Sequence, residues 1–172
     1  DMHVRAGSFI LKGTPVVTVL SDAPLPLSSS TAYQQSINDA FVLGQERTAL
    51  QDPLFAVNQL VEMALRALSP SLNDPFTAIN CIDRLAEALG SFRDDTLPKN
   101  AMVNEDGKLC IINCDVTYAR LFEGAFTQIR QSCCSHIFVL MHLLDTFILL
   151  IDASDKASFV VEAVRRQIID IK

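Results

Sequence analysis

Two Asp-Pro pairs, at residues 52–53 and 74–75, have the residue types best suited to the start of a helix. An aspartate at the N-cap accepts hydrogen bonds from the unsatisfied N–H groups of the first turn, and proline suits the first helical position because it has no N–H to satisfy. The same N–H groups, aided by an arginine, also hold anions. Each pair therefore predicts a helix start whose aspartate has two interpretations: a structural cap, or part of an anion-binding site.

Further polar side chains near these two helix starts complete a candidate ligand site. Antiparallel neighbouring helices place their N-termini at opposite ends, so the two starts meet only if residues 44–48 or another subunit fold across to the second one. A small anion is the ligand that such a site favours, and no residue is assigned a catalytic role. The candidate ligand-binding residues are Glu46, Arg47, Thr48, Asp52, Asn73, Asp74 and Thr77.

Two other pairs of titratable or charged side chains have both a structural and a chemical interpretation. His142 and Asp145 are three residues apart on a predicted helix and share a face, either as a hydrogen-bonded pair or as an acid–base dyad. Arg66 and Asp83 are predicted to form an ion pair between two helices, because an unpaired buried charge is costly. We expect the structural role for both pairs.

The five cysteines are odd in number and lie mostly in apolar patterns, which indicates a reducing compartment and thiols that pack as small hydrophobic groups. A zinc site that combines them with His136 is unfavourable. Cys110 and Cys114 fall on a predicted strand about 13 Å apart, too far for one tetrahedral ion. Adjacent cysteines such as Cys133 and Cys134 rarely bind the same ion. No metal and no cofactor are predicted.

The sequence has none of the common catalytic motifs. It lacks the phosphate-binding P-loop, the G-x-G-x-x-G dinucleotide motif, the H-E-x-x-H zinc motif and the G-x-S-x-G nucleophile elbow. Their absence favours a non-enzymatic role.

Composition indicates a globular domain and argues against two classes of partner. The 172 residues are 49% hydrophobic, which is enough for one core. The net charge of -6, with no cluster of Lys or Arg, disfavours nucleic acid and anionic lipid, which both attract basic proteins. A mean hydropathy of +0.27 is high for a soluble domain, so we expect a homo-oligomer whose copies cover each other's apolar surface.

Residues 1–44 are predicted to form a small β-rich element and a linker. Alternating residues over 1–20, with two glycines for tight turns, indicate short strands. The stretch 21–30 is rich in Pro and Ser and indicates a linker. A short helix or extended arm is expected over 28–39, followed by a short strand over 40–43.

Beyond Gly44 the apolar period changes from two to 3.6, which predicts an antiparallel helix bundle over residues 45–172. Two helices begin at the Asp-Pro pairs, and three more cover about 116–134, 135–152 and 158–171. An Asp-Gly turn within the bundle sequence predicts a β-hairpin at about 101–114. The predicted fold class is therefore α+β, mainly α.

The helix predicted at 135–152 is apolar on nearly all sides. Its longest apolar run, residues 137–151, is too short to cross a bilayer unaided. A helix of this kind is enclosed on every side, either by its own bundle or by a second subunit.

The N-terminal run VRAGSFILKGTPV, residues 4–16, resembles the half motif of biotinyl and lipoyl barrel-sandwich domains. The lysine hairpin that carries the cofactor in those domains is absent. The resemblance implies β structure in this region and no swinging-arm function.

A series of motifs is spread over much of the chain: FVLGQERT at 41–48, QDP at 51–53, ALRALSP at 64–70, NDPFTA at 73–78 and DRL at 83–85. Together they resemble the C-terminal soluble region of a bacterial family of predicted membrane proteins of unknown function. The resemblance implies that the protein's own N-terminal transmembrane segments, absent from this chain, lie in the inner membrane of a bacterium. The cysteine usage, rather than the resemblance, favours the cytoplasmic side for this domain.

These observations predict a soluble assembly or ligand-sensing domain of a bacterial membrane protein. The alternative is an anion-binding or hydrolytic site at the Asp-Pro helix N-termini. Convergence of the seven candidate residues around one concave space would favour the alternative, and separate capping of each helix would not.

Overall fold

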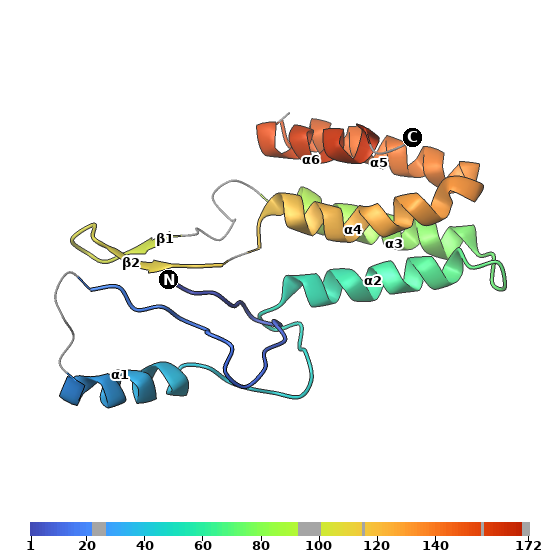
Figure 1. Ribbon diagram of the computed structural model, residues 1–172. Helices are drawn as coiled ribbons and strands as arrows, with labels where there is room; N and C mark the ends of the chain where they lie inside the picture. Colours follow the sequence, from blue (N-terminus) through green and yellow to red (C-terminus); the bar gives the residue numbers. More distant parts are fainter. Residues whose placement is uncertain (22–26, 93–100, 115, 156, 170–172) are drawn as a thin grey trace. The chain divides into compact units, whose positions relative to one another are not determined.

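The computed structural model describes residues 1–21, 27–92, 101–114, 116–155 and 157–169 (Figure 1). The chain divides into two compact units. The first comprises Asp1–Thr48 and Lys99–Cys114, and the second comprises Ala49–Pro98 and Asp115–Lys172. The β-hairpin therefore groups with the N-terminal residues, although helices flank it in the sequence.

In the first unit, β1 (Ala101–Val103) and β2 (Leu109–Ile112) form the predicted antiparallel hairpin. At its turn the N–H of Asn104 donates to the carbonyl oxygen of Lys108 at 2.9 Å. The N–H of Lys108 donates in return to Asn104 Oδ1 at 2.8 Å. Gly107 has a φ of 76°, a conformation that glycine adopts without strain. The Asp-Gly signal thus locates this turn correctly.

The N-terminal residues of the first unit form fewer strands than predicted. One isolated bridge pairs Met2 with Val17, and the N–H of Met2 also donates to the carbonyl oxygen of Ile112 at 2.8 Å. The predicted arm is a helix, α1 (Leu27–Asp39). The strand predicted over 40–43 does not form, because the N–H groups of Ala40 and Phe41 bond to carbonyl groups at the end of α1 instead.

The first unit has no core among its described side chains. None of these side chains is fully buried, and Phe9, Leu20 and Val42 each expose more than three quarters of their surface. A two-stranded hairpin without a covered hydrophobic face is marginally stable in water. The buried apolar residues of the described chain all lie in the second unit.

The second unit consists of helices whose positions follow the predicted periodicity. These helices and the β-hairpin of the first unit confirm the predicted fold class, α+β and mainly α. A 3-10 turn at Cys133–Ser135 precedes the most apolar helix, which therefore starts two residues later than predicted. Within the described ranges, no helix has both the length and the apolar character needed to cross a membrane. The helices are α2 (Pro53–Ala67), α3 (Pro75–Gly90), α4 (Tyr118–Ser132), α5 (Ile137–Ala153) and α6 (Ser158–Ile169).

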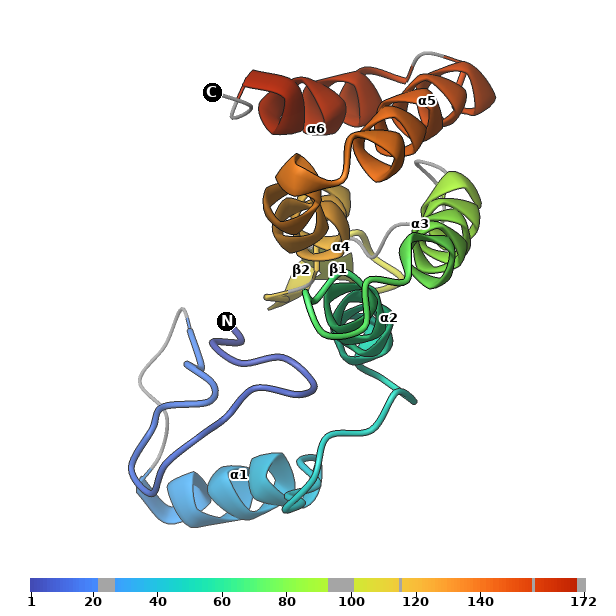
Figure 2. The same ribbon diagram turned by 90° about the vertical axis from the view of Figure 1, so that its right-hand side faces the viewer.

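The helices of the second unit are arranged in layers (Figure 2). Helix α2 packs on α3 and α4, and these two carry α5 and α6, which lie side by side in an outer layer. The short turn between α2 and α3 makes them antiparallel. Helices α3 and α5 run parallel, because Phe76 contacts Phe138 near their starts and Gly90 lies next to Leu150 near their ends.

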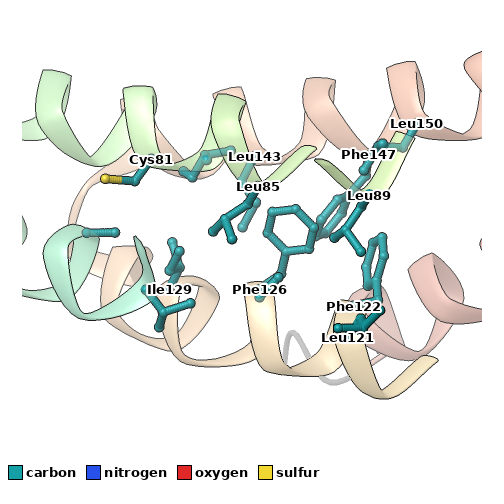
Figure 3. Close-up of a cluster of buried hydrophobic side chains, with 14 of the residues drawn as sticks. Cys81, Leu85, Leu89, Leu121, Phe122, Phe126, Ile129, Leu143, Phe147 and Leu150 are labelled. Carbon is teal, nitrogen blue, oxygen red and sulfur yellow. The ribbon is translucent and has the colours of Figure 1, made fainter. Parts of the chain in front are cut away.

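Phenylalanine side chains from α4 and α5 form the centre of the core (Figure 3). The ring centroids of Phe122, Phe126 and Phe147 are between 4.9 and 5.4 Å apart, in tilted or edge-to-face contact. Full burial of one such side chain contributes roughly 2–3 kcal/mol to stability. This cluster therefore fixes the outer layer to the layer beneath it.

Candidate functional site

The second Asp-Pro start is a well-formed helix cap. Asp74 Oδ1 accepts a hydrogen bond from the N–H of Thr77 at 3.1 Å, and Oδ2 accepts one from Thr77 Oγ1 at 2.6 Å. These bonds, the side-chain bond foremost, lower the pKa of Asp74 below its ordinary value of 3.8. Asn73, with a φ of 46°, turns the chain into this cap. Both carboxylate oxygens of Asp74 thus serve the helix start.

The first Asp-Pro start has a different environment. Asp52 is the N-cap residue of α2, and only 1% of its surface is exposed. Its carbonyl oxygen accepts a hydrogen bond from the N–H of Phe55 at 3.1 Å. Because α2 spans about 22 Å and is antiparallel to α3, Asp52 and Asp74 lie at opposite ends of the helix pair. The four candidate residues of the second unit therefore form two separate groups.

The remaining candidate residues, Glu46, Arg47 and Thr48, belong to the first unit, and all three are exposed. The seven predicted residues are thus divided between the two units. Their combination into one ligand site stays a prediction, and the observed hydrogen bonds at Asp74 and Thr77 are those of a cap.

His142 and Asp83 form a pair that the sequence did not predict. His142 Nε2 on α5 lies 2.7 Å from Asp83 Oδ1 on α3. The predicted pairs His142–Asp145 and Arg66–Asp83 are wrong. Arg66 bonds instead to Glu62 at 3.0 Å, one turn earlier on α2. Whether a neighbour on the same helix or a side chain on another helix becomes the partner depends on how the helices pack.

A buried polar cluster between α4 and α6 was also missed from the sequence. Arg130, 5% exposed, donates from Nε to Gln167 Oε1 at 3.0 Å, and Gln167 Nε2 donates to Thr127 Oγ1 at 2.8 Å. Arg130 lies on the apolar face of its helix, and this position in the sequence could have indicated a buried polar contact. The cluster satisfies polar groups that would be costly to bury alone, so we assign it to the attachment of α6.

The cysteines are all free, and their environments differ. Burial raises the pKa of the Cys133 thiol from 9.0 to about 11 and also raises the pKa of Cys81. Cys110, Cys114 and Cys134 are exposed. Across the described part of the chain, no three His, Cys, Asp or Glu side chains gather in a way that could hold a metal ion.

The outward side of α5 is the most distinctive surface of the second unit. Its inward residues, such as Val139, Leu143 and Phe147, are buried in the bundle. Its outward apolar residues, together with the neighbouring Phe76 of α3, are between 59% and 71% exposed. The rings of Phe76 and Phe138 are in edge contact, with centroids 6.3 Å apart. We name the following set the α5 face: Phe76, Ile137, Phe138, Met141, Ile148 and Leu149.

Comparison with known proteins identifies the family. Residues 1–148 match the family model described as "Predicted membrane protein (DUF2254)". Uncharacterized proteins of Mycobacterium bovis and of two Mycobacterium tuberculosis strains are each 36% identical to this chain over 89 residues. The aligned region covers 52% of this chain and 17% of each of these curated relatives. No solved structure is significantly similar. The chain belongs to the DUF2254 family of predicted membrane proteins.

Proposed function

We propose that the helical unit is an assembly domain, through which copies of a longer membrane protein associate by way of the α5 face. The observation that supports the proposal is the exposure of six large apolar side chains on one side of an otherwise well-packed bundle. The proposal refers to a membrane protein because the family is described as predicted membrane proteins. It refers to a longer chain because the aligned region covers only 17% of each curated relative.

The size of the α5 face agrees with an interface between protein chains. With about 200 Å² as the full surface of a side chain of this size, the exposed fractions correspond to roughly 800 Å². Monomeric proteins seldom expose a contiguous apolar patch larger than about 600 Å². A stable protein–protein interface buries about 800 Å² on each partner. The α5 face is thus large enough for a specific interface.

A protein partner fits this surface better than a lipid surface does. The chain has a net charge of -6, and α5 carries no Lys or Arg. Docking on an anionic membrane relies on basic side chains around the apolar residues. An acidic apolar surface instead favours a protein partner, and a second copy of the chain is always available at equal concentration.

We further propose that this domain lies on the cytoplasmic side of the membrane. Three of the five free cysteines are exposed, and exposed thiols persist in a reducing compartment. Attachment of an impermeant thiol reagent to Cys110, Cys114 or Cys134 in intact cells would contradict this orientation. Labelling only after lysis is the expected result.

Light scattering on the purified chain tests the assembly role. We expect a mass above that of one chain for the wild type and the mass of one chain for Ile148→Lys, because the lysine ammonium group loses its hydration when an apolar interface covers it. Met63→Lys is the matched control, since Met63 on α2 is half exposed and lies outside the α5 face. The control is expected to keep the wild-type mass.

Circular dichroism tests whether both variants remain folded, and we expect that they do because both substitutions are at exposed positions. A wild-type chain that is monomeric at micromolar concentration would contradict the proposal. The same conclusion would follow if Ile148→Lys and Met63→Lys changed the mass equally.

A further inference from the structure

Two aspartates lie among the apolar residues of the α5 face. Asp145 and Asp152 are both exposed and follow the spacing 138, 141, 145, 148, 152. Steps of three and four residues keep all five positions on one side of a helix, in the pattern of a helix–helix seam. Neither aspartate side chain has an ion-pair partner among the described residues. A surface that covers this seam must therefore supply cations opposite the two carboxylates, or leave them uncompensated.

The neighbouring helix α6 supplies such a cation. Val161, Arg165 and Ile168 are exposed and lie four and three residues apart, so they form one stripe. Arg166 belongs to a different side of α6, where it contacts Glu162 at 3.2 Å and Glu123 of α4 at 3.8 Å. Arg165 makes no ion pair with any residue in the part of the chain that the structure describes.

Asp145 and Arg165 also lie at the same level of the outer layer. Helices α5 and α6 are joined by the short segment 154–157, so they are antiparallel. Asp145 precedes this segment by nine residues and Arg165 follows it by eight, which places each about 12–14 Å from the turn. Helices α5 and α6 lie side by side in the outer layer, as Figure 2 shows.

We infer that two copies associate face to face through their outer layers, with α5 of one copy on α6 of the other and Asp145 opposite Arg165 of the second copy. A two-fold axis that runs along the helices exchanges α5 with α6 and keeps each residue at its level. The same contact therefore forms twice. This inference rests on the proposed assembly role and names its partner, its symmetry and its charge pairing.

Exchange of the two charges tests the pairing in the full chain. In Asp145→Lys the introduced cation faces Arg165, and in Arg165→Glu the introduced anion faces Asp145, so both homodimers contain two like-charge contacts. Each variant alone is expected to weaken self-association by about tenfold or more. In a mixture of the two variants every contact is between opposite charges, so we expect association to return to the wild-type level. Sedimentation velocity measures all three samples.

A second readout uses ionic strength. The association of the wild type is expected to weaken as salt rises, because partly exposed charge pairs are screened. If both charge variants associate like the wild type while Ile148→Lys dissociates, the pairing is wrong and the assembly role stands. If each charge variant alone dissociates and the mixture of the two does not regain association, the two-fold arrangement is wrong. If Ile148→Lys itself leaves association unchanged, the assembly role and the pairing both fail.

Discussion

His142 on α5 and Asp83 on α3 are joined by a hydrogen bond of 2.7 Å. They are 59 positions apart in the sequence. The side chains remain 33% and 52% exposed, so water weakens the attraction between them. The pair therefore defines how α3 and α5 align more than it stabilises the bundle.

A double-mutant cycle measures this contact. His142→Ala and Asp83→Ala are each expected to lower the free energy of unfolding, and their coupling energy is expected to be about 0.5 kcal/mol, as for partly exposed pairs. Urea denaturation of the wild type, the two single variants and the double variant, all at the same protein concentration, gives the coupling energy. His142→Ala combined with Arg84→Ala is the control, because Arg84 bonds to Glu87 on its own helix. Coupling of equal size in the control cycle would contradict the assignment.

The cap at Asp74 predicts a stability difference that depends on pH. The folded protein holds the pKa of Asp74 below its ordinary value of 3.8, so the ionised carboxylate stabilises the fold above that pH. The stabilisation is lost as the pH falls through the lowered pKa. Asp74→Ala is expected to reduce the melting temperature by a few degrees at neutral pH. The difference from the wild type should shrink in acid.

Calorimetry over a series of acidic buffers measures the effect, and Thr77→Val serves as the partner variant because it removes the hydroxyl donor to Asp74. A difference between wild type and Asp74→Ala that stays constant from neutral to strongly acidic pH would disprove the cap as its origin.

Tyr118 predicts the opposite dependence on pH. Its hydroxyl group is buried with no hydrogen-bond partner among the described residues, and burial raises the pKa of Tyr118 from 10.0 to about 12. A raised pKa means that the stability tied to this group is present below pH 10 and is lost as the pH rises towards 12. Tyr118→Phe is expected to be neutral or to stabilise by up to about 1 kcal/mol. It should also resist alkaline unfolding.

Alkaline titration followed by circular dichroism makes this comparison, with Tyr33→Phe as control because Tyr33 lies exposed on α1. A large loss of stability in Tyr118→Phe would instead show that the hydroxyl group makes a stabilising hydrogen bond.

The cysteines provide a test of burial in both units. Cys110, Cys114 and Cys134 are exposed, whereas Cys81 and Cys133 are buried and have raised pKa values. The thiolate is the reactive form, so the two buried thiols should react slowly. An Ellman titration of the native chain is expected to show three fast thiols, and the other two should appear on denaturation. Five fast thiols would contradict the packing around α4.

The helices of the second unit could be predicted from the sequence because their local signals agree with their packing. The pairs Asp52-Pro53 and Asp74-Pro75 mark two helix starts, and the 3.6-residue period predicts the helices that follow in the sequence. The Asp-Gly dipeptide locates the hairpin turn for the same reason. In each case the residues that carry the signal are close together in the chain.

Contacts between distant residues could not be predicted in this way. His142 has Asp145 on its own helix as a plausible partner, and only the parallel packing of α3 and α5 brings Asp83 nearer. The bond between Arg130 and Gln167 likewise depends on where α6 lies on α4. The apolar character of residues 137–151 predicts a covered helix, but it does not show which residues the chain's own bundle leaves exposed.

The mass of the wild-type chain in solution tests the central claim most directly. Sedimentation equilibrium over a range of micromolar concentrations is expected to fit an equilibrium that ends at twice the chain mass of 18.9 kDa, and Ile148→Lys is expected to stay at 18.9 kDa. A folded wild-type chain that remains at 18.9 kDa throughout would contradict the account of the α5 face.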